Sequence, residues 1–78
     1  MSAVNIVMTK IKPKLLETFG GVLGNNLITK GLGAMRSASG DEGKYKACVD
    51  AICSDPQVVG LWGQATVNKI KAEWLKLV

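Results

Sequence analysis

Apolar residues recur every three or four positions through most of this 78-residue chain, which is the period of an amphipathic α-helix. In the first such segment, residues 3–19, the spacing continues unchanged past Pro13. Proline inside a helix removes one backbone hydrogen bond and crowds the preceding turn, at a cost of about 3 kcal/mol. We therefore expect one helix over 3–19 that is kinked at Pro13, or a short helix that leads into a longer one starting near Lys12. Its apolar stripe consists of Val4, Met8, Ile11, Leu15 and Phe19, with Val7 beside them.

Glycines mark the end of this helix and the apolar face of the next one. The pair Gly20-Gly21 is typical of a helix end that requires positive φ. The second helix is expected over 21–37, with one apolar and one polar face. Gly24 and Gly31 lie on the apolar face, where each costs about 1 kcal/mol relative to alanine. Glycine at these positions predicts the close approach of another helix backbone.

The third helix follows a loop of small and polar residues and is expected over 41–53. The loop ends in Ser39-x-x-Glu42, which is the spacing of a capping box with Ser39 as the N-cap. Acidic residues in the first turn also suit the positive end of the helix dipole. The residues of this helix that we expect to point inward are Tyr45, Cys48, Val49 and Ile52.

The last stretch opens on Asp55-Pro56, which is a strong signal for a helix start. The Asp55 carboxylate can accept backbone N–H groups of the first turn, and Pro56 fits the first helical position because no N–H is needed there. No proline follows, so we expect one helix over 56–77. Because its first half has apolar residues on two sides, we expect this helix to be the central one. Its main apolar stripe consists of Val59, Gly63, Val67, Ile70, Trp74 and Leu77.

Four helices with short connections predict an all-α fold, either a small four-helix bundle or an orthogonal helical array. A chain of this length has no room for a second hydrophobic core, so we expect a single domain over residues 1–78. The candidate helix–helix contact residues are Gly24, Gly31, Leu27, Trp62 and Trp74.

The residue types present argue against catalysis and metal binding. The chain has no histidine, which removes the commonest general base and a frequent metal ligand. Cys48 and Cys53 are five residues apart, so on a helix they face different sides, and no second cysteine pair completes a zinc site. The acidic residues fit helix caps or solvent-facing helix positions. We therefore expect a non-enzymatic protein with no cofactor and no metal.

The positive charge of the chain comes almost entirely from lysine. The net charge is +4, and only one arginine is present. Nucleic-acid binding calls for a tighter basic stripe with exposed aromatic residues, and Tyr45 is expected in the core, so the pattern disfavours nucleic acid as a partner. The candidate basic surface residues are Lys10, Lys12, Lys14, Lys69, Lys71 and Lys76.

An apolar fraction of 47% and a mean hydropathy of +0.19 are high for so short a chain, and they predict exposed apolar surface that a partner covers. Our first hypothesis is a protein–protein interaction module that self-associates or docks on a partner protein. The alternative is a membrane surface, which amphipathic helices with lysine-rich polar faces can bind. The chain is short and basic and contains glycine and tryptophan, and in this composition it resembles small cationic helical bacteriocins, which implies a membrane-active peptide. Two cysteines and the acidic pair Asp41-Glu42 depart from that pattern.

No uncharged apolar stretch reaches the roughly 18 residues of a membrane-spanning helix. The first residues also do not follow the pattern of a signal peptide, because polar residues and lysines interrupt them. We therefore expect a cytoplasmic location, with leaderless secretion as the alternative.

Overall fold

The structure, a computed structural model, describes residues 2–77, and within this range it contains helices and no strands. The all-α prediction is therefore confirmed. The helices in chain order are α1 (Ala3–Ile6), the π-helical turn η1 (Val7–Ile11), α2 (Lys12–Met35), α3 (Asp41–Cys53), α4 (Pro56–Trp62) and α5 (Gln64–Leu75).

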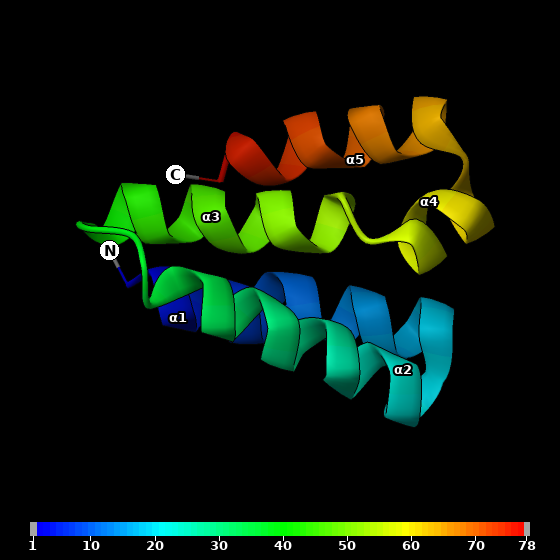
Figure 1. The fold of residues 1–78 in the computed structure, drawn as a ribbon, viewed down its shortest axis with the longest axis horizontal. Helices are drawn as coiled ribbons and strands as arrows, with labels where there is room; N and C mark the ends of the chain where they lie inside the picture. Colours follow the sequence, from blue (N-terminus) through cyan, green and yellow to red (C-terminus); the bar gives the residue numbers. More distant parts are fainter. Residues whose placement is uncertain (1, 78) are drawn as a thin grey trace.

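The helices lie in three layers (Figure 1). On one side of α3, α1 and η1 lead into the first half of α2, and the second half of α2 returns beside them. On the other side of α3, α5 runs back along it, and both chain ends lie at the same end of the molecule. The central helix is therefore α3 and not the C-terminal stretch that we expected, because α3 lies between the two outer layers and packs against both α2 and α5. Its inward-pointing residues are fully buried: Tyr45, Cys48, Val49 and Ile52.

The first helix accommodates Pro13 through a π-helical turn placed directly before it. The Lys12 N–H donates to the Val7 carbonyl, five residues back, so the backbone widens just where proline would otherwise crowd the preceding turn. This turn also changes which residues face the core. In a regular α-helix, side chains four residues apart point in directions that differ by about 40°. The π turn has more residues per turn and offsets part of this difference, so residues at four-residue spacing stay on one face. The buried residues are Ala3, Val7, Ile11 and Leu15.

The apolar stripe that we predicted for this helix is therefore wrong at its first two positions. Val4 is 52% exposed and Met8 is 39% exposed. Both residues were placed on the apolar stripe by assuming a rotation of about 100° per residue. This rotation holds for an α-helix and not across a π turn. Two large apolar side chains consequently lie on the surface near the N-terminal end.

Two glycines of α2 lie at close helix crossings. Gly20 has a φ of 83° and separates α2 into two helical halves, so the second half begins at 21 as predicted, although it ends at Met35 and not at 37. A Cβ added at Gly24 would lie 3.1 Å from the Leu15 carbonyl oxygen in the first half. At Gly31, a Cβ would lie 2.6 Å from the Cys48 Sγ in α3. Glycine thus allows α2 to fold back on itself and to approach α3.

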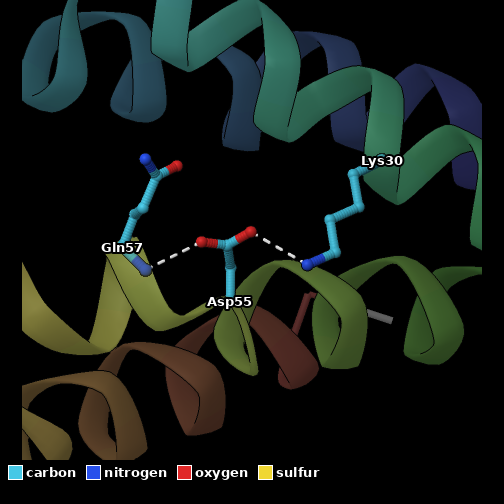
Figure 2. A network of polar contacts seen from close by, with 3 residues as sticks. All are labelled: Lys30, Asp55 and Gln57. Atoms are coloured by element: carbon cyan, nitrogen blue, oxygen red, sulfur yellow. Dashed lines mark hydrogen bonds and ion pairs between the residues drawn. The ribbon is translucent and has the colours of Figure 1, made fainter.

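Asp55 begins α4 as the sequence predicts, and it also joins α4 to α2 (Figure 2). Its Oδ1 accepts a hydrogen bond of 2.8 Å from the Gln57 backbone N–H. Its Oδ2 accepts one of 2.8 Å from the Lys30 Nζ. The predicted capping box of α3 is wrong, however: the N-cap is Gly40, with a φ of 74° and no side-chain cap. Ser39 lies one residue too early to cap this helix.

The predicted helix over 56–77 is broken at Gly63. This residue has a φ of 83° and a ψ of 151°, a conformation that is almost restricted to glycine, and it separates α4 from α5. The chain changes direction there, and α5 ends at Leu75. Because of this break, the C-terminal stretch packs as two short helices, with Leu61 and Leu77 exposed.

Candidate interaction surface

The predicted basic residues lie on two separate sides of the molecule. Lys10, Lys12 and Lys14 belong to the layer of η1 and α2, whereas Lys69, Lys71 and Lys76 belong to α5 or its C-cap, across α3 (Figure 1). The two groups therefore do not combine into one basic stripe.

The positive charge of Lys71 is partly balanced by an acidic side chain of α3. Its Nζ lies 2.6 Å from an Asp50 carboxylate oxygen of α3, and this hydrogen bond raises the pKa of Lys71 above its usual value. The interaction connects α5 to α3 at the surface. This ion pair helps to hold the two helices together. Its contribution to stability is small because both side chains are partly exposed.

The titratable groups of the core have structural roles. The Tyr45 hydroxyl donates a buried hydrogen bond of 2.7 Å to the Trp74 carbonyl oxygen, and burial raises the pKa of Tyr45 to about 12. Cys48 and Cys53 are both free and buried, and burial raises the pKa of each thiol to about 11. Both thiols are therefore neutral near pH 7, and the reactive thiolate form is scarce. Among residues 2–77, no cluster of potential metal ligands is found.

The remaining predicted contact residues lie in or against the core. Leu27 is 2% exposed and Trp74 is 7% exposed, while Trp62 is partly buried. The Trp62 ring lies 5.2 Å from the Phe19 ring of α2 and 6.2 Å from the Trp74 ring of α5, measured between centroids. Trp62 thus joins the two outer layers at the end of the molecule where the chain reverses.

Two long segments of sequence at that end contain no charged residue. Residues 18–29 and residues 56–68 contain no Asp, Glu, Lys or Arg. The first segment contains the reversal at Gly20 and the second contains the reversal at Gly63, and both reversals lie at the end opposite the chain termini (Figure 1). The contact between Phe19 and Trp62 holds the two segments together. We refer to residues 18–29 and 56–68 as the charge-free end.

Two large apolar side chains are exposed at the charge-free end. Val22, in the first turn after Gly20, is 83% exposed, and Leu61, near the end of α4, is 60% exposed. These are the most exposed of the large apolar residues within the described range. Sequence reasoning missed this surface, although both uncharged runs can be read from the chain. The surface can be recognised only when it is known that the two uncharged runs meet in the fold.

Comparisons with known proteins give no family to which this surface can be related. No protein-family model, no curated protein and no solved structure matches the chain. Within residues 2–77, no helix combines the length and the apolar character that crossing a bilayer requires.

Proposed function

We propose that this protein is a non-enzymatic helical interaction module that self-associates through its charge-free end. The observation that carries the proposal is the exposure of Val22 and Leu61 on a surface formed by two segments without any charged residue. Large exposed apolar residues in a small protein are typical of surfaces that another molecule covers.

The charge distribution supports self-association in particular. Each copy has a net charge of +4, so the repulsion between two copies is smallest when they meet where charged side chains are absent. Contact through the lysine-bearing sides of η1 or α5 would desolvate like charges, which is strongly unfavourable. Contact through residues 18–29 and 56–68 desolvates no charged side chain of these segments. This agrees with the general depletion of charged residues in the cores of protein interfaces.

A specific contact at this end would cover a substantial share of the molecular surface. A standard interface covers about 800 Å² on each partner, roughly a fifth of the 4430 Å² surface of this protein. The polar residues within the end are amides and hydroxyls, such as Gln64 and Asn68, which hydrogen-bond to each other at 2.8 Å. Such groups can stay hydrated at an interface rim or pair across it at little cost.

A membrane surface is the competing proposal, and it fits the charge distribution less well. Surface-binding helices present an apolar face to the lipid with lysines along the flanks. Here the apolar faces of η1 and α5 are directed toward the core, and their lysines lie on opposite sides of α3. A bilayer could therefore contact one lysine group or the other, but not both in the same orientation.

A matched pair of substitutions tests the proposal by sedimentation equilibrium. Leu61→Asp places a charge on the charge-free end, whereas Leu77→Asp makes the same change just beyond the C-terminal end of α5. Both side chains are exposed, which favours folding of both variants. We expect the native protein to associate as concentration rises, and Leu61→Asp to weaken this association at least tenfold, or about 1.4 kcal/mol. Leu77→Asp should leave it unchanged.

Three outcomes would overturn self-association through this end. The native protein could remain monomeric at every concentration, or both variants could weaken association equally. The third is leakage of dye from anionic vesicles at low micromolar protein, which would establish the membrane alternative.

A further inference from the structure

A second surface feature lies at the opposite end of the molecule, near the chain termini. An open pocket of about 350 Å³ is formed where α1, the end of α2 and the start of α3 meet. It is remote from the charge-free end, so an inference about it stands independently of self-association. The residues that line it are Val4, Leu32, Met35, Arg36 and Lys44.

The pocket combines an apolar interior with a positively charged border. Met35 is 5% exposed and belongs to the core, and Leu32 packs against the core. Val4 is the exposed apolar residue that the π turn leaves on the surface. Arg36 and Lys44 are both exposed, and they supply the two cations of the border. A ligand that fits this arrangement has an apolar chain and a negative head group.

Neither cation is engaged by an acidic side chain within residues 2–77. The ion pairs in this range join Lys30 to Asp55, Lys46 to Glu42 and Lys71 to Asp50. Two acidic residues begin α3 next to the pocket. Of these, Glu42 pairs with Lys46 at 3.6 Å, and Asp41 is exposed to solvent. The positive charge of the pocket border is therefore available to an anion.

We propose that this pocket binds a single-chain alkyl carboxylate, with the chain against Val4, Leu32 and Met35 and the carboxylate at Arg36 and Lys44. A volume of about 350 Å³ is near the lower limit of small-molecule sites, so it accommodates one chain and not the two chains of a membrane lipid. Arginine favours carboxylates because its planar group can donate two parallel hydrogen bonds to them.

Calorimetric titration with ligands of matched chain length tests the charge requirement. Decanoate, used below its micelle concentration, should bind saturably with one site per chain. Decyltrimethylammonium has the same alkyl chain with the opposite charge and should not bind. Dodecanoate adds two methylenes, each worth about a fourfold gain in affinity at the usual 0.8 kcal/mol per buried methylene, until the pocket is filled. Equal binding of the cationic and anionic ligands would overturn the proposal.

Paired variants test the location of the site. Arg36→Gln with Lys44→Gln should lower decanoate affinity at least tenfold, since both side chains are exposed and the fold does not depend on ion pairs from them. Lys69→Gln with Lys76→Gln removes the same charge elsewhere and should leave the affinity unchanged. Equal losses in the two double variants would show non-specific attraction and overturn the proposal. Absence of saturable decanoate binding would also overturn it. A changed oligomeric state of the Arg36→Gln/Lys44→Gln variant would in that case indicate that a second copy occupies the pocket.

Discussion

Individual glycines in this protein have opposite roles within one helix, and alanine substitutions should distinguish them. At Gly31 an added Cβ would lie 2.6 Å from the Cys48 Sγ and 3.0 Å from the Ile52 Cδ1, and both of those residues are fully buried. Gly31→Ala should therefore destabilise the fold by about 1–3 kcal/mol, the usual cost of overpacking. Unfolding in denaturant, with the slope compared between variants, measures this change.

Gly33 is the control for this prediction, because it lies in the same helix and a Cβ there would meet no atom within 4 Å among residues 2–77, apart from its chain neighbours and its own helix backbone. Gly33→Ala should be neutral or should stabilise the fold by up to about 1 kcal/mol through helix propensity. If Gly31→Ala behaved in the same way, the close crossing of α2 and α3 would not exist in solution.

The charge of Asp55 connects α4 to α2, so its contribution to stability should depend on pH. The hydrogen bond from Lys30 is the largest cause that lowers the pKa of Asp55, and the Gln57 backbone N–H lowers it further. A carboxyl with a lowered pKa stabilises the fold fully above its unfolded pKa of about 3.9, and this stabilisation is lost as pH falls through the lower folded value. Asp55→Ala should cost about 1–2 kcal/mol near pH 7.

The measurement is the free energy of unfolding of both proteins between about pH 7 and pH 2. The gap between native protein and Asp55→Ala should be constant down to about pH 4 and should shrink below it. Asp41→Ala, which removes an exposed carboxylate at another helix start, should show a small gap throughout. A large gap for Asp55→Ala that persists at pH 2 would mean that the charge of Asp55 is not what stabilises the fold.

Sequence reasoning at this scale succeeds where the signal is local. The cap formed by Asp55 follows from two adjacent residues, and the sequence predicted it. Its second partner, Lys30, lies 25 residues earlier and could not be predicted without the fold. The close approaches at Gly24 and Gly31 can also be predicted, because the periodicity of the sequence places both glycines on an apolar face.

At the scale of elements, the break at Gly63 should be as sensitive to substitution as a core position. Its φ of 83° with a ψ of 151° belongs to a region that residues with a Cβ almost never adopt, and such strain costs about 1–3 kcal/mol. Gly63→Ala should lower stability by this amount, although a Cβ there would meet no atom within 4 Å. Thermal unfolding followed by circular dichroism measures the effect.

Gly60 provides the comparison, three residues earlier and inside α4. It is helical and exposed, with open space around a Cβ, so Gly60→Ala should be neutral or stabilising. Similar midpoints for the two variants would indicate that α4 and α5 form one continuous helix, as the sequence pattern predicted.

Glycine explains why the predicted bounds of α3 are correct, whereas α4 and α5 were predicted as one helix. The bounds predicted for α3, 41–53, agree with the structure because glycine and charged residues border a clear apolar pattern. Gly63 lies on an apolar stripe of the sequence, and this pattern predicts a continuous helix through it. It directly follows Trp62, just as Gly20 follows Phe19, and that shared pattern of an aromatic residue before glycine is the signal that could have revealed the break.

At the scale of the whole molecule, the two reversals at Gly20 and Gly63 create the surface on which the proposed function rests. Each uncharged segment taken alone resembles an ordinary helix boundary. Only the arrangement of α2 and α5 on either side of α3 brings the two segments to the same end. The sequence therefore predicted an exposed apolar surface from composition but could not locate it, because the location depends on contacts such as the one between Phe19 and Trp62.

The most direct test of self-association through the charge-free end is a dilution series of isotopically labelled protein followed by amide NMR. Up to about 1 mM, even an association of about −4 kcal/mol is visible. Shifts that depend on concentration should be confined to residues 18–29 and 56–68 and their immediate neighbours. Shifts centred instead on the lysine-bearing residues 10–14 and 69–76, or no shifts across the series, would contradict the account.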